Sequence, residues 1–129
     1  MFLQNKILDN LNSLAIIVNS NFEIIYISPS VNEILGFNPN ELLGNNWWLK
    51  TKNSQAEIDY SKKKLNGFNI DSDSHEKRTY ESKIRTKWGN SKWILWNISI
   101  NNDDEIIAIG NDITKRKEYE VLLEKKTNK

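Results

Sequence analysis

The fold of this chain is decided by one stretch of sequence, Ile106-Ile107-Ala108-Ile109-Gly110-Asn111-Asp112-Ile113-Thr114, and by the charged residues 115–120 that follow it. The apolar start is short and β-branched, which predicts a buried strand. Asp112 and Thr114 then offer side-chain oxygens to the free N–H groups that open a helix, so we expect a helix over residues 115–129. A strand joined directly to an exiting helix suits a module that transmits a signal rather than one that performs chemistry by itself.

Four further strands are predicted upstream of this junction. Residues 15–18 and 24–27 are apolar runs separated by a turn, which is typical of a β-hairpin. Residues 78–87 alternate between apolar and charged side chains, and Trp88-Gly89-Asn90-Ser91 supplies a hairpin turn before residues 93–100. The last of these runs is apolar on both faces, so we expect it to be covered on both sides.

Helices are predicted in the remaining segments. Residues 1–14 carry a one-sided stripe of Leu3, Ile7, Leu11 and Leu14, which predicts an amphipathic helix before the first strand. Between the second and third strands, two short proline-initiated helices each end at a glycine, and a longer amphipathic helix spans residues 54–65. The fold class is therefore α+β, with an antiparallel sheet and helices packed on its faces.

Composition excludes several function classes. The 129 residues fit one domain, and the net charge of +1 provides no field for nucleic acid or an anionic membrane. The chain has no cysteine, which removes disulfides, thiolate nucleophiles and cysteine-ligated zinc. It shows no membrane-spanning run and no signal peptide, so we expect a cytoplasmic location. We find no nucleophile–base pair, metal cluster or phosphate loop, and predict no enzymatic activity and no catalytic residue.

With this order of elements, four segments resemble the PAS domain family. Residues 19–30 look like its first hairpin and helix entry, and residues 36–44 resemble its Gly-Tyr-x-x-Glu-Glu-Leu-x-Gly segment. Residues 80–93 are similar to its central hairpin, and residues 112–117 resemble its Asp-x-Thr-x-Arg-Lys exit signature. The resemblance covers roughly residues 10–120.

The resemblance implies a PAS fold: a five-stranded antiparallel sheet of order 2-1-5-4-3, with short helices enclosing a pocket on one face. It divides the chain into a flanking helix (1–14), a PAS domain (15–114) and an exit helix (115–129) that leads to an output domain. It also implies a sensory and dimerisation module of a multidomain signalling protein such as a two-component sensor histidine kinase. The alternative is a protein–protein interaction module without ligand, attached to a cyclic-dinucleotide enzyme or a phosphatase.

No cofactor or metal is expected. His75 lies in the polar loop 66–77, whereas haem-binding relatives place their histidine on the helix that here spans 54–65. The light-sensing relatives use a cysteine that this chain lacks, which leaves only a non-covalent flavin as a minor alternative. Asn69-x-Asp71-x-Asp73 mimics the start of a calcium loop, but its glycine and bidentate glutamate positions hold Ser74 and Tyr80.

The ligand pocket is predicted from alternation along the strands together with the strand register that the resemblance to the PAS family implies. If Trp93 faces inward, its large indole would oppose small residues on the next strand and take up the volume of a cofactor. The domain would then bind a small ligand or none. The predicted pocket residues are Tyr80, Ile84, Trp93, Leu95, Ala108 and Gly110.

The opposite sheet face is too apolar to remain exposed. We expect the N-terminal stripe to cover it, within one chain or from a second subunit, which predicts a homodimer. The residues assigned to this outer and dimer face are Leu3, Ile7, Leu11, Trp96, Ile98, Ile107 and Ile109. Asp112 and Thr114 are assigned to the signal exit. The basic residues 115–117 sit where a helix dipole favours acids, and local physics does not explain them.

Overall fold

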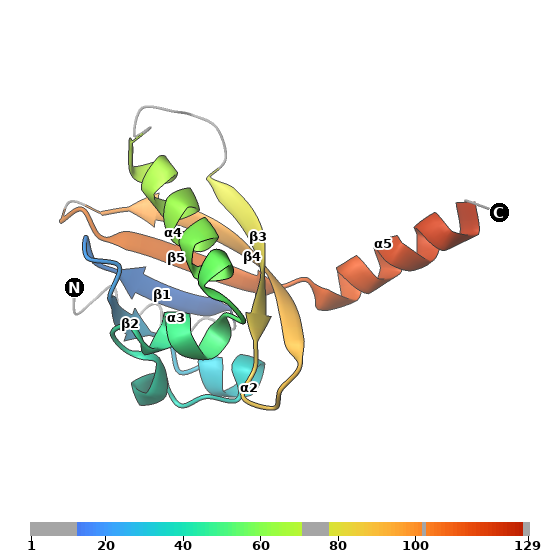
Figure 1. The fold of residues 1–129 in the computed structure, drawn as a ribbon, viewed down its shortest axis with the longest axis horizontal. Coiled ribbons are helices and arrows are strands. Elements are labelled where there is room, and N and C mark those ends of the chain that lie inside the picture. The colour runs from blue at the N-terminus through green and yellow to red at the C-terminus, as the bar shows by residue number, and fades with distance from the viewer. Residues whose placement is uncertain (1–12, 71–77, 102, 128–129) are drawn as a thin grey trace.

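The computed structural model describes residues 13–70, 78–101 and 103–127. Five antiparallel strands form a single sheet in the order β2-β1-β5-β4-β3 (Figure 1), which confirms the predicted PAS topology. The strands are β1 (Leu14–Val18), β2 (Ile24–Ile27), β3 (Thr79–Arg85), β4 (Ser91–Ile100) and β5 (Ile106–Asp112). Residues 1–12 of the predicted N-terminal helix (1–14) and the 71–77 part of the polar loop lie outside the described residues. Leu14, which was grouped with that helix, begins β1 instead.

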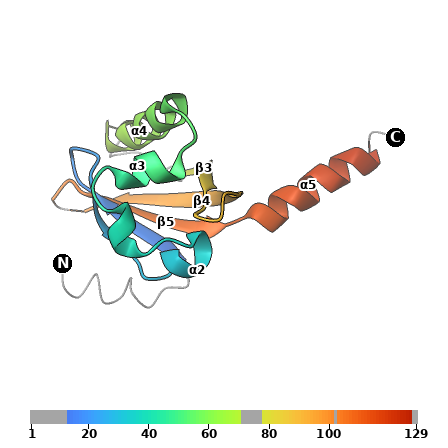
Figure 2. The same ribbon diagram turned by 60° about the horizontal axis from the view of Figure 1, so that its bottom comes forward.

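Helices connect β2 to β3 and continue from β5. They are α2 (Val31–Leu35), the 3-10 helix η1 (Pro39–Leu42), α3 (Asn46–Thr51), α4 (Gln55–Ile70) and α5 (Thr114–Thr127). Figure 2 shows α3 and α4 over one face of the sheet, while α5 extends away from the domain. Gly36 ends α2 with a φ of +84°, a conformation that favours glycine. Trp47 and Trp48 lie side by side in the sequence of the short helix α3.

The core lies between the sheet and these helices. Trp47 and Trp48 of α3 are buried there, together with Ile58 and Leu65 of α4. Their burial explains why α3 forms despite its short length, since tertiary packing rather than propensity stabilises most helices. Arg85 at the end of β3 holds α3 in place: its guanidinium donates hydrogen bonds to the carbonyl oxygens of Leu49 (3.1 Å) and Lys50 (3.2 Å) and to Asn53 Oδ1 (3.1 Å).

The side chains of β4 point to the opposite faces of the sheet from those predicted from the sequence. In the sheet, Trp96 pairs with Tyr80 on one side and with Gly110 on the other. Directly paired residues of antiparallel strands share a face, so Trp96 lies on the same face as those two predicted pocket residues. Trp96 and Ile98 are therefore buried under the helices, not on the outer face to which they were assigned. A change of one residue in register reverses every side chain of a strand.

The same correction moves two predicted pocket residues. Trp93 and Leu95 lie on the opposite face from Trp96, because Trp93 pairs with Lys83 and Leu95 pairs with Glu81. Both are only partly buried. The assumption that Trp93 points inward was wrong because β4 is apolar on both faces, so its pattern gives no preferred orientation.

The outer face of the sheet holds a second, smaller apolar cluster. Ala15 and Ile17 of β1 are fully buried there, and Tyr26, Ile107 and Ile109 pack against them. Ile107 and Ile109 thus lie on the face predicted for them. The stripe expected to cover this face, Leu3, Ile7 and Leu11, is outside the described residues. Within the described ranges, no helix is long and apolar enough to cross a membrane.

Candidate functional site

The space that the fold could offer to an internal ligand is occupied by tryptophan. Trp96 packs edge-to-face against Trp47, with ring centres 5.9 Å apart. The Trp96 indole N–H donates a hydrogen bond to Ser82 Oγ at 3.0 Å, so its polar atom is satisfied. Gly110 lies against this ring: a Cβ atom there would come within 2.7 Å of Trp96 Cζ3. The expected pairing of a large residue with a small one is present, with Trp96 in the place proposed for Trp93.

The void that remains inside has a volume of about 10 Å³. That is about the space that one water needs. Tyr80, Ile84 and Ala108 line this void with Trp96 and Lys52, so the structure brings together three of the six predicted pocket residues there. Gly110 lies nearby under Trp96, while Trp93 and Leu95 are on the other face. This void, lined by described residues, is far too small for a flavin or haem.

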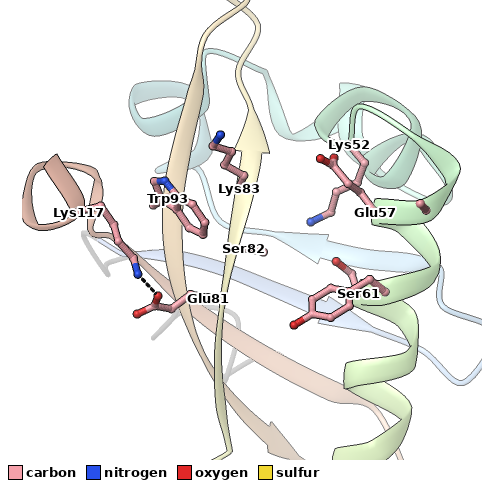
Figure 3. Close-up of a pocket in the computed structure, with 10 residues that line it drawn as sticks. Lys52, Glu57, Ser61, Glu81, Ser82, Lys83, Trp93 and Lys117 are labelled. Carbon is pink, nitrogen blue, oxygen red and sulfur yellow. Dashed lines mark ion pairs between the residues drawn. The ribbon is translucent and has the colours of Figure 1, made fainter. Parts of the chain in front are cut away.

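A larger space lies at the edge of the sheet. A groove of about 520 Å³ runs across the edge strand β3, between α4 and the first turn of α5. Figure 3 shows Lys52, Glu57 and Ser61 on one side of β3, with Trp93, Glu81 and Lys117 on the other. This groove was not predicted, because its walls come from three elements that only the tertiary fold brings together.

Lys52 is the unusual residue of this groove. Only 5% of its surface is exposed, although lysine is rarely buried without a partner. Burial lowers the pKa of the Lys52 ammonium to about 8, and the nearby charge of Glu57 opposes that shift. Among the described residues we find no acceptor within hydrogen-bond or ion-pair distance of this ammonium. No pattern in the sequence distinguishes Lys52 from its exposed neighbour Lys50.

The exit junction forms a continuous hydrogen-bonded link from β4 to α5. Asp112 Oδ1 accepts hydrogen bonds from the backbone N–H (3.0 Å) and the hydroxyl (2.6 Å) of Thr114. Thr114 Oγ1 accepts in turn from the Trp93 N–H at 2.9 Å, and the Ile113 N–H donates to the Trp93 carbonyl at 2.8 Å. The predicted exit residues Asp112 and Thr114 are therefore in direct contact at the start of α5.

Ionic contacts support this link. Burial raises the pKa of Asp112, but the hydrogen bonds from Thr114 and the charge of Lys92 outweigh it, so the net pKa is lowered. The Lys92 ammonium lies 3.4 Å from Asp112 Oδ2. Asp112 therefore holds its negative charge in place at the opening of the helix.

The basic cluster at the start of α5 has a tertiary explanation. Glu81 of β3 forms ion pairs with Arg116, at 2.9 Å, and with Lys117. The Lys117 ammonium also lies 5.1 Å from the centre of the Trp93 ring, and Lys83 approaches the same ring at 5.7 Å. The cations that oppose the helix dipole are thus held by an acidic side chain on a neighbouring strand. Sequence reasoning missed Glu81, because its partners are 35 residues or more away in the chain.

Beyond its first turn, α5 is exposed. Its large apolar side chains are between 50% and 69% accessible, and they are Tyr119, Val121, Leu122 and Leu123. An apolar stripe on a helix that projects from a domain is a surface for association.

The described residues contain no cluster of acidic, histidine or cysteine side chains that could hold a metal. Asp71, Asp73 and Ser74 of the calcium-like sequence, and His75, lie outside those residues. The structure therefore leaves the predictions on them as they were.

Comparison with known proteins identifies the family. A family model described as the PAS domain matches residues 12–115, and the chain belongs to this family. No curated protein matches the chain. The PAS domain is a sensory module, so the class of protein predicted from the sequence is confirmed.

Solved structures support the fold. An RNA-binding light-oxygen-voltage receptor matches 99% of this chain at 14% identity and a TM-score of 0.75, and the chain spans 37% of that protein. A sensory box histidine kinase/response regulator from Burkholderia thailandensis matches 99% of the chain and 96% of its own length (17% identity, TM-score 0.68). The Cronobacter turicensis RpfR quorum-sensing receptor PAS domain, in complex with C12:0, matches 81% and 97% (25% identity, TM-score 0.63).

Proposed function

We propose that this domain is the sensory and dimerisation module of a cytoplasmic multidomain signalling protein, and that α5 passes its state to an output domain. The observation that carries the proposal is the rigid attachment of a projecting helix. Asp112, Thr114 and Trp93 join α5 to the sheet, and Glu81 fixes its first turn. We infer a two-component sensor histidine kinase as the parent protein, supported by the structural likeness to sensory-box kinases.

Dimerisation through α5 is the part that can be tested on the domain itself. The exposed stripe that includes Leu122 and Leu123 would be covered by the same stripe of a second copy. Sedimentation velocity should show a dimer for the native chain and a monomer for the double variant Leu122→Glu/Leu123→Glu. The matched control Glu120→Gln alters the charge of an exposed site on the opposite side of α5 from Leu122 and should leave the dimer intact. A native chain that stays monomeric at high concentration would refute the dimer.

The kinase assignment has its own test. If the coding sequence downstream of Lys129 encodes a histidine-containing dimerisation helix, a kinase is the parent protein. A cyclic-dinucleotide enzyme or phosphatase encoded there would replace the kinase assignment.

The alternative, an interaction module without ligand, is favoured by the small internal void of about 10 Å³. A thermal-shift screen distinguishes a ligand-binding sensory module from this ligand-free alternative, because a specific ligand raises the melting temperature by mass action.

A further inference from the structure

We propose that the groove between α4 and β3 is a binding site for a small organic monocarboxylate whose carboxylate pairs with the Lys52 ammonium. This inference deepens the proposed sensory role and rests on it, since it names the class of ligand and places it outside the interior. The argument depends on Lys52, on the charges of the groove wall, and on its size.

Lys52 supplies a cation that lacks its counterion. A buried ammonium needs hydrogen-bond acceptors, and the described residues place none within reach. Glu57 carries the nearest opposing charge identified for it, but one Glu57 oxygen already accepts the backbone N–H of Asn53 at 2.7 Å. A carboxylate entering the groove would supply the missing acceptor as a charge-assisted hydrogen bond.

Two buried hydroxyls line the same groove. Ser61 is 1% exposed and Ser82 is 8% exposed, and both line the groove with Lys52. Ser82 Oγ already accepts the Trp96 indole proton, so its own hydroxyl proton is directed elsewhere and is free to donate. One ammonium and a hydroxyl donor fit the two oxygens of a carboxylate.

The charge of the walls selects a monoanion. Three lysines and two glutamates line the groove, and Glu81 is already paired with Lys117 and Arg116. A dianion such as a phosphate monoester bound at Lys52 would face Glu57, because Lys83, which has no ion pair with any described residue, lies on the other face of β3 beside Trp93. The volume of about 520 Å³ is far larger than an inorganic ion needs and falls within the range of roughly 300–1,000 Å³ that is usual for small-molecule sites. Ala56, Tyr60 and Trp93 provide apolar surface for the body of an organic acid.

The position of the groove gives binding a consequence. Its far wall is formed by Trp93, Glu81 and Lys117, which are the residues that attach α5 (Figure 3). A ligand that extends from Lys52 across β3 would therefore touch the first turn of the exit helix. Binding would change the state of α5 only if the ligand contacts these residues differently in two conformations of the domain.

The test is an NMR titration of the isotope-labelled chain with acetate, hexanoate and benzoate, and with the matched neutral amides of each. We expect at least one acid to shift the resonances of Ala56, Ser61 and Ser82 saturably, and its amide to bind roughly tenfold more weakly or not at all. The side-chain resonances of Lys52 should titrate at higher pH when the acid is bound.

Two variants complete the test. Lys52→Met keeps the length of the side chain and should abolish acid binding, whereas Lys63→Met, at an exposed site on the groove-forming helix α4, should retain it. Equal binding of acid and amide, binding that persists in Lys52→Met, or no binding by any of the acids would overturn the inference. Binding at Lys52 without any change in the α5 amide resonances would support the site and contradict the proposed transmission instead.

Discussion

Replacing Gly110 with alanine tests whether Trp96 fills the interior as described. The added Cβ would lie 2.6 Å from Ile94 Cγ2 and 2.7 Å and 2.9 Å from two carbons of the Trp96 ring. These separations are shorter than real Cβ contacts, and both neighbours are buried on a central strand, so neither can move freely. Overpacking of this kind costs about 1–3 kcal/mol. The reduced entropy of the unfolded chain returns about 0.4–1 kcal/mol, since Gly110 does not need a positive φ.

The expected net result is a loss of about 1–2 kcal/mol in the free energy of unfolding. Urea denaturation followed by tryptophan fluorescence measures it. Gly67→Ala is the matched control, because Gly67 lies in α4 with no heavy atom within 4 Å of the new Cβ. That variant should instead gain about 0.5–1 kcal/mol from improved helix propensity.

A double-mutant cycle assigns the loss to the ring contact. Trp96→Phe removes the outer part of the indole that the new Cβ meets, so Gly110→Ala should cost at least about 0.5 kcal/mol less in that background. If the two substitutions are additive, or if Gly110→Ala is as stable as the native chain, the description of the filled interior is wrong.

Three further predictions concern charged groups. Asp112 has a lowered folded-state pKa, so its contribution to the free energy of unfolding is present above the ordinary value of 3.8 and is lost as the pH falls through the folded value. Asp112→Asn should therefore flatten the acid side of the curve of stability against pH, measured by urea melts. An unchanged acid side would contradict the link to Thr114. The folded-state pKa of Lys52, about 8, lies below its ordinary 10.5, so the unfolded chain binds the extra proton between these values and stability should rise with pH across that window. Lys52→Met should abolish this rise and stabilise the domain at neutral pH by up to about 3 kcal/mol; a variant less stable than the native chain would show that the ammonium has an internal partner. Glu81→Gln should accelerate amide hydrogen exchange in the first turn of α5 while costing no more than about 1 kcal/mol of global stability, because the pairs are partly exposed; exchange that matches the control Glu33→Gln would mean that Glu81 does not hold the helix.

The sequence was sufficient for most of the elements because their signals were local and numerous. The β-branched run at residues 106–109, the Gly89 turn and the Pro29 and Pro39 breaks each mark an element on their own. The strand order itself came from the resemblance to the PAS family. Helix α4 extends five residues beyond the predicted end at residue 65, because it continues through Asn66 and Gly67, which usually mark the end of a helix.

The orientation of β4 could not be obtained in the same way. Its side chains are apolar at both odd and even positions, so alternation does not distinguish the core face from the outer face. What decides it is Gly110 on β5, which leaves room for only one large partner, and that partner is Trp96 by register. The identity of the large residue was therefore mistaken although the expectation of a large–small pair was sound.

The candidate site was the least accessible to sequence reasoning. The groove depends on Lys52 at the end of α3, Ser61 on α4 and Lys117 on α5, which have no common motif. The tertiary fold, rather than any local pattern, decides which of several similar lysines becomes buried and loses its hydration. By contrast, Asp112 and Thr114 were identified in advance, because a helix start with side-chain oxygens is a local arrangement.

Strand β3 carries an anchor for a helix at two places. Arg85 donates hydrogen bonds to the last carbonyl oxygens of α3, and Glu81 forms ion pairs with the first turn of α5. Arg85 and Glu81 are four residues apart on the strand, which corresponds to roughly 13 Å. Because β3 is an edge strand, it has a neighbour on only one side and can tilt with less resistance than the strands within the sheet. A small tilt of this edge strand would displace the ends of both helices together. The hinge of the domain therefore lies at the edge of the sheet and does not require a change in the tryptophan-filled interior.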